Sequence, residues 1–178
     1  MAGVLLRKLR TLTSLPVFTL VWLVPVWILL GLCRLAILTV PLRRMAPFYG
    51  DDIGICPWVP LASPGQIARA RDIRRTIGLA AGYSPWTANC YPQALAARVM
   101  MRLYGVPHAI HFGLRREAEG PEAGGRDGEG REIAAHAWVV CGPVPVTGGH
   151  SFGLYTVVRS FAARGLLPST QQNAPPEG

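Results

Sequence analysis

The stretch PWTANCYPQALAARVMMRLYG, residues 85–105, decides how the rest of the chain is interpreted. It passes from a polar segment into a run whose apolar residues recur every three or four positions, which is typical of a buried amphipathic helix. Asn89 is a suitable N-cap, Pro92 is tolerated in the first turn, and Gly105 suits the position after the last turn. The pattern therefore predicts a central helix that begins at Cys90.

A cysteine at the start of a helix is either a small buried residue or a nucleophile. Thiols attack as thiolates, and a free cysteine has a pKa of about 8.5. The start of a helix offers a partial positive charge and unpaired amides, which favour the thiolate and can hold an oxyanion. Cys90 is therefore a candidate nucleophile, and the structural alternative stays open.

A cysteine nucleophile also needs a base, and the chain has four histidines: His108, His111, His136 and His150. His136 is the strongest candidate, because it lies in the predicted strand at residues 133–141 between two alanines that permit close approach. His111 is the rival, since it alternates with apolar residues in a second predicted strand. Either histidine is equally compatible with a hydrogen-bonded core residue.

Composition divides the chain into four parts. Residues 1–50 form an apolar, basic helical region with six basic residues and no acidic one. A linker rich in Pro, Gly and Asp follows at 51–65, then an enzyme-sized domain at 66–168, and a disordered tail at 169–178. Within the domain, an amphipathic helix precedes the central one, and two strands flank an acidic loop before a final strand or helix. This order predicts an α+β fold with the central helix packed on an antiparallel sheet.

The N-terminal region contains 23 uncharged residues at 11–33, enough to span a bilayer as one helix. Pro16 and Pro25 interrupt the run, and basic residues on both flanks give no orientation. Two interpretations stay open: a segment in or on the membrane, or two apolar helices split near Gly31 that pack on the domain or on a partner.

Cysteine spacing and charge exclude several classes of function. Cys33, Cys56, Cys90 and Cys141 form no CxxC pair, so we expect no metal, free thiols and a reducing cytoplasm. The net charge is +8, but no groove-reading motif accompanies the arginines, so nucleic acid is not an expected partner. No motif for an organic cofactor is present either.

Three segments together resemble the transglutaminase-like cysteine peptidases of lasso-peptide biosynthesis. They are the stretch quoted above, the following VPHAIHFGLRR (106–116), and AHAWVVC (135–141). The resemblance is to the B-protein leader peptidase in its split form, and it covers roughly residues 66–161. It implies a transglutaminase/papain-like core with Cys90 as nucleophile and His136 as general base, without a cofactor.

The resemblance also implies a substrate and partners. Such proteins cut the leader from a ribosomally made precursor peptide, together with a separate leader-recognition protein and an ATP-dependent macrolactam cyclase. The implied location is the cytoplasm, with contact to the inner face of the membrane through residues 11–33 left open. Residues 1–50 would then dock a partner, and their removal would weaken cleavage more than it disturbs the fold.

This sequence departs from the family at the third catalytic position. An Asp is usual about twelve residues after the His, and Gly148 stands there instead. Thr147, Asn89 or a main-chain carbonyl is the expected replacement for orienting His136, with Asp72 or Asp127 as remoter alternatives. The departure keeps two other functions open: transglutaminase-type acyl transfer, and a non-catalytic scaffold that binds peptide and recruits the cyclase.

Overall fold

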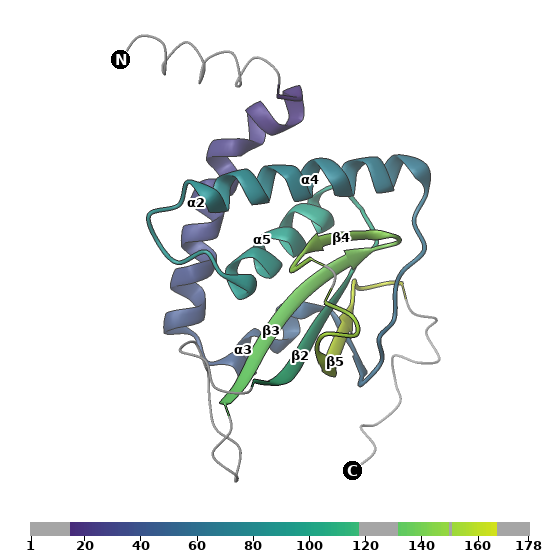
Figure 1. The fold of residues 1–178 in the computed structure, drawn as a ribbon. Helices are drawn as coiled ribbons and strands as arrows, with labels where there is room; N and C mark the ends of the chain where they lie inside the picture. The colour runs from purple at the N-terminus through teal and green to yellow at the C-terminus, as the bar shows by residue number, and fades with distance from the viewer. Residues whose placement is uncertain (1–14, 118–131, 150, 167–178) are drawn as a thin grey trace.

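The computed structural model describes residues 15–117, 132–149 and 151–166, without the side chains of residues 42, 43, 117 and 132. Helices gather on one side of a sheet, and α5 lies between that sheet and the other two long helices (Figure 1). The elements, in chain order, are α2 (Val17–Thr39), α3 (Leu42–Tyr49), β1 (Asp51–Gly54), α4 (Pro64–Gly82), α5 (Cys90–Leu103), β2 (Ala109–Glu117), β3 (Glu132–Cys141), β4 (Val144–Thr147) and β5 (Thr156–Ala162).

The sheet has five strands in the order β1-β5-β2-β3-β4, and every neighbouring pair is antiparallel. The long pair β2–β3 sets the register, with Gly113 opposite His136 and His111 opposite Trp138. This arrangement confirms the predicted α+β fold and the two strands on either side of the acidic loop. The segment left open as strand or helix is a strand, β5.

The two faces of β3 pack against different material. Ala137, Val139 and Cys141 belong to the main core together with α5 and α4. Trp138 and Val140 belong to a smaller cluster on the other face, which Trp58 helps to cover. Side chains on a strand alternate between faces, so each face of β3 has its own role.

Helix α4 begins at Pro64, just inside the stretch predicted as linker. Ser63 accepts a hydrogen bond from the amide of Gln66, whose side chain accepts one from the amide of Ser63, forming a capping box just before Pro64. The buried residues of α4 follow the helical period: Ala70, Ile73, Ile77 and Ala80. The predicted amphipathic helix is therefore present, and its arginines lie on the exposed side.

Residues 1–50 and 51–65 differ from the predicted division of the chain. Helix α2 runs unbroken through Pro25 and Gly31, because its inner face, including Val26 and Leu30, is buried in the main core. Residues Asp51–Gly54, expected in the linker, pair with β5 as strand β1. The domain thus begins within α2. Removing residues 1–50 would therefore delete side chains that belong to the main core.

Helix α2 is long and apolar enough to cross a bilayer, by length and composition alone. Its outer face remains exposed, with Val17, Val21, Val24 and Leu38 each more than 60% accessible. One face of α2 is therefore covered by the domain, while the other is an apolar surface open to a partner or a membrane.

Candidate active site

Cys90 begins α5, and its sulfur lies among backbone amides. Burial raises the pKa of the Cys90 thiol, while amides of Ala137, Tyr91 and Cys90 itself lower it in part. The expected effect of the helix start is thus present but is outweighed by burial. In the free protein the thiol holds its proton at neutral pH, so attack requires a base.

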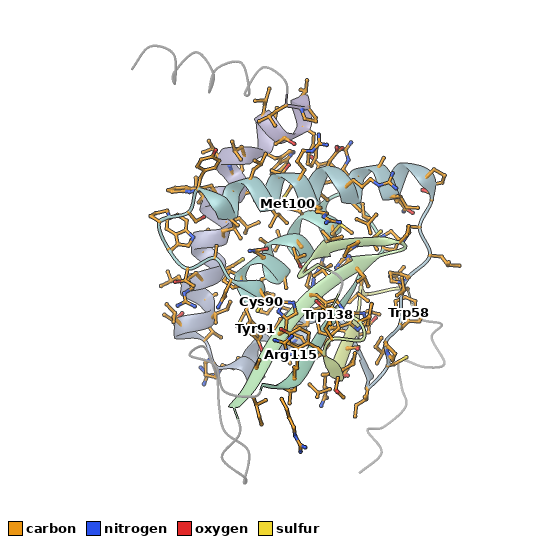
Figure 2. The ribbon with its side chains drawn as sticks, in the orientation of Figure 1. Trp58, Cys90, Tyr91, Met100, Arg115 and Trp138 are labelled. Carbon is orange, nitrogen blue, oxygen red and sulfur yellow. The ribbon has the colours of Figure 1, made fainter. Side chains whose placement is uncertain are left out.

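The amide of Ala137 connects the two predicted catalytic residues. Ala137 follows His136 directly in β3, so the Cys90 sulfur reaches the strand beside the expected base. Figure 2 shows Cys90 at the end of α5 that faces β3. Within the described ranges, no hydrogen bond joins the thiol to the imidazole itself. The imidazole lies with Trp138 on the face of β3 away from α5.

The imidazole of His136 is held in one orientation. Its Nε2 lies 3.2 Å from the carbonyl oxygen of Gly148. Because a carbonyl only accepts, Nε2 carries the proton, and in the neutral ring Nδ1 keeps a free lone pair. The ring stacks on Tyr155 at 4.7 Å and on Trp138 at 5.8 Å between centroids. His136 therefore has the tautomer and the half-buried setting that a general base needs.

Gly148, at the position where the resemblance implies an Asp, supplies that carbonyl. Its φ of +75° is in the left-handed region, and a Cβ there would lie 2.9 Å from His136 Nε2 and 2.5 Å from the Cβ of Trp138. The backbone at Gly148 passes too close to the His136 ring to leave room for a side chain at this position. A main-chain dipole thus occupies the place of a carboxylate.

Ser151 fixes the Gly148 carbonyl from the other side. Its hydroxyl donates to the same oxygen at 2.5 Å, and Ser151 is buried. Both lone pairs of this oxygen are therefore used. Neither Ser151 nor the specific carbonyl was predicted; the signal in the sequence is the GG turn followed closely by a Ser at residues 148–151.

Among the other predicted orienting residues that the structure describes, none has a side-chain hydrogen bond to His136. Thr147 is buried in β4, and its hydroxyl has no partner in the described part of the chain. Asn89 occupies the N-cap position of α5 without a side-chain cap hydrogen bond. Asp72 pairs with Arg69 at 3.5 Å on α4. Asp127 and His150 lie outside the described residues.

His111, the rival base, is a core residue. It is fully buried, its Nδ1 lies 2.7 Å from the Ser160 hydroxyl, and burial lowers its pKa to about 4. His108 is also buried, with its pKa lowered to about 4, chiefly by burial. Of the three described histidines, His136 alone is half-buried and accessible.

The segment that leads into Cys90 is anchored on α2. Trp86 packs on Trp27 with 4.5 Å between ring centroids, and Trp27 Nε1 donates to the carbonyl of Tyr83. Gly31 permits this contact, because a Cβ there would lie 3.0 Å from the Trp86 ring. The conformation ahead of the nucleophile thus depends on the N-terminal helix.

No group of three or more His, Cys, Asp or Glu with the arrangement of a metal site occurs in the described parts of the chain. The residues that surround Cys90 and His136 are aromatic rings, small side chains and backbone groups. The expectation of a mechanism without metal or cofactor stays a prediction.

Comparison with known families places these residues in context. The family model of the transglutaminase-like superfamily matches residues 36–160, which include Cys90, His136 and Gly148. The chain therefore belongs to the transglutaminase-like superfamily, whose members are generally cysteine hydrolases and transferases. No curated protein and no solved structure matches it.

Proposed function

We propose that this chain is a cysteine peptidase that removes the leader from a ribosomally synthesised lasso-peptide precursor. The observation that carries the chemistry is the Cys90 thiol at the amide of Ala137, the residue that follows His136 in β3. The three segments that resemble split B-protein leader peptidases support the substrate. The family match supports the reaction class.

In the proposed reaction, His136 Nδ1 takes the thiol proton through bridging water, because the ring lies on the face of β3 away from α5, as the Cys90 sulfur attacks the scissile carbonyl. Amides at the start of α5 donate hydrogen bonds to the negative oxygen of the tetrahedral intermediate. The imidazolium then returns its proton to the leaving amine, leaving a thioester. Water, deprotonated by Nδ1, hydrolyses the thioester and regenerates the thiol.

Cleavage assays with the purified chain, a precursor peptide and its recognition protein test this proposal. We expect release of the leader with addition of one water across the cut, measured by mass spectrometry. Cys90→Ala and His136→Ala should both abolish release. Cys141→Ala is the matched control, since Cys141 is a buried core thiol of β3. Undiminished cleavage by Cys90→Ala would refute the proposal.

Acyl transfer is the second candidate, because the superfamily includes transferases that use the same pair of residues. The thioester intermediate is common to both reactions, and only the acceptor differs. An assay with an added primary amine separates them, since transfer joins the amine to the peptide while hydrolysis adds water.

A scaffold without catalysis is the third candidate. The raised pKa of Cys90 and the absence of an acid at position 148 favour it. In that case, Cys90→Ala should bind precursor and cyclase as the wild type does, and no cleavage should occur with either.

The proposed partners are the precursor peptide, the leader-recognition protein and the macrolactam cyclase, and the proposed location is the cytoplasm. The exposed apolar face of α2 supports docking of a partner protein on that helix. Replacing Val21 and Val24 by Ser should weaken recruitment of the recognition protein in pull-down assays. Because both side chains face outward, the thermal unfolding midpoint should not change.

A further inference from the structure

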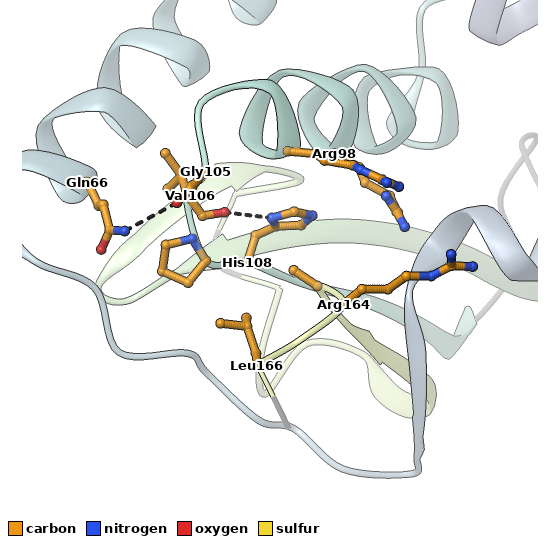
Figure 3. A pocket seen from close by; sticks show the side chains of 10 residues that line it. Gln66, Arg98, Gly105, Val106, His108, Arg164 and Leu166 are labelled. Atoms are coloured by element: carbon orange, nitrogen blue, oxygen red, sulfur yellow. Dashed lines mark hydrogen bonds between the residues drawn. The ribbon is translucent and has the colours of Figure 1, made fainter. Parts of the chain in front are cut away.

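Three arginines surround a cavity at the end of α5 opposite Cys90. Arg98 and Arg102 come from α5 and Arg164 from the chain after β5, and the cavity has a volume of about 300 Å³ (Figure 3). Residues 98–102 lie two to three helical turns beyond the nucleophile, so this cavity is separate from the candidate active site.

The positive charge of this cluster is only partly compensated. Arg98 is 6% exposed, and its Nε has no hydrogen-bond partner within the described ranges. Burial, followed by the charges of Arg102 and Arg164, lowers the pKa of Arg98 to about 10, while Asp51 acts in the opposite direction. Arg164 donates to the carbonyl of Pro47, a neutral group. A buried cation with one carboxylate near it, as at Arg98, favours the binding of an anion.

His108 adds a second kind of recognition to the cavity wall. It is 1% exposed, and its Nδ1 lies 2.9 Å from the carbonyl oxygen of Val106, which requires a proton on Nδ1. The remaining Nε2 has no partner in the described part of the chain. Its lone pair accepts a hydrogen bond, so the cavity suits an anion that also carries a hydroxyl.

An apolar groove of about 430 Å³ adjoins this cluster and shares Arg98 and Arg102 with it. Its other walls come from α2, α3 and α5 and include Leu32, Ala36, Val40, Phe48 and Val99. The groove is continuous with the outer face of α2, which has the length and composition of a membrane helix. A cationic pocket beside an apolar groove is complementary to a molecule with an anionic head and a hydrocarbon chain.

We propose that this composite site binds an anionic phospholipid with a hydroxyl-bearing headgroup. Arg98, Arg102 and Arg164 hold the phosphate, and His108 Nε2 accepts from a headgroup hydroxyl. One acyl chain lies in the groove beside α2. Arginines that line a pocket next to a membrane-length helix bind lipid phosphates in this manner. The site would keep the chain at an anionic membrane surface.

Soluble short-chain lipids test the site on the wild-type chain. Dihexanoyl-phosphatidylglycerol should raise the thermal unfolding midpoint, and dihexanoyl-phosphatidylcholine at equal concentration should not. Equal stabilisation by inorganic phosphate would mean that the pocket binds free phosphate, and would overturn the lipid proposal. Displacement of phosphatidylglycerol by a short Glu-rich peptide, but not by phosphate, would assign the site to an acidic peptide instead.

Vesicle sedimentation tests which arginines bind the lipid. Arg102→Gln/Arg164→Gln should weaken binding to vesicles containing phosphatidylglycerol by about 25-fold, since one surface arginine contributes about fivefold. Arg74→Gln/Arg75→Gln on the exposed face of α4 removes the same charge and should change binding far less. Equal losses in the two pairs would show attraction by net charge alone and overturn the site. Both members of the test pair are exposed, so folding should persist.

Discussion

The Nε2 atom of His136 lies 3.2 Å from the carbonyl oxygen of Gly148, twelve residues further along the chain. A carbonyl orients the imidazole as a carboxylate does, but it provides a dipole instead of a full charge. In the proposed reaction the imidazolium would therefore have a dipole beside it instead of a full negative charge. An imidazole held in one orientation by a neutral group is the central property of this candidate site.

Gly148→Ala should impair both stability and cleavage, because its Cβ would press on His136 and Trp138. Gly149→Ala is the matched control, since Gly149 also has a positive φ, of +67°, with no atom within 4 Å of its Cβ position. The control should lose about 1–2 kcal/mol from left-handed backbone strain alone. Gly148→Ala should lose about 1–3 kcal/mol more from overpacking. Urea unfolding and cleavage rates measure both effects, and equal losses would contradict the close contact.

Ser151→Ala should lower kcat about tenfold with little change in KM, because the Gly148 carbonyl loses one of its two donors and the imidazole loses its exact position. Ser160→Ala is the control, since Ser160 is equally buried but bonds His111. The control should lose about 1–3 kcal/mol of stability and keep its kcat. A fall in kcat with Ser160→Ala alone would assign the base to His111.

Alkylation of Cys90 should accelerate only at pH values above the ordinary thiol range, because burial raises its pKa. Cys56→Ser is the background for this measurement, since Cys56 is exposed and would react first, while Cys33 and Cys141 are buried. Iodoacetamide labelling followed by peptide mass spectrometry gives the profile. A midpoint below pH 7 in the free chain would show a preformed thiolate.

The chain should lose stability as the pH falls from 6.5 towards 4. The pKa values of His108 and His111 are lowered to about 4 in the folded state, against about 6.5 when unfolded. The unfolded chain therefore binds more protons in this interval, and stability declines there and is constant above it. At pH 5 the loss should be about 2 kcal/mol per histidine. Urea midpoints at pH 7.5 and 5 measure it, and His111→Gln should roughly halve the difference.

Gly31→Ala should destabilise the chain although alanine favours helices, because its Cβ would lie 3.0 Å from the Trp86 ring. Gly78→Ala in α4 is the control, since its Cβ would meet nothing within 4 Å and should add about 1 kcal/mol of stability. The thermal unfolding midpoints of the two variants measure these opposite effects. Stabilisation by both substitutions would mean that Trp86 does not rest on α2.

Much of the fold follows from local patterns. The apolar period from Leu95 onward predicts α5, and the alternation around Phe112 predicts β2. Each of these signals comes from residues within a single helix or strand, so it can be recognised from the sequence alone. The superfamily follows too, because its characteristic residues sit on those elements.

Features that depend on distant partners were not predictable. Asp51–Gly54 reads as a linker and becomes β1 only by pairing with β5. Helix α2 continues through Pro25 because the domain buries its inner face. A main-chain carbonyl was one of the groups expected to orient His136, but no side-chain motif reveals that Gly148 supplies it. In each case tertiary contacts, and not local preference, decide the outcome.

The stacking of Trp86 on Trp27 ties the segment four residues ahead of the nucleophile to the N-terminal helix. Helix α2 therefore both packs on the core and supports the segment that leads into α5. A partner that binds the outward side of α2 therefore contacts the same helix that supports the approach to Cys90.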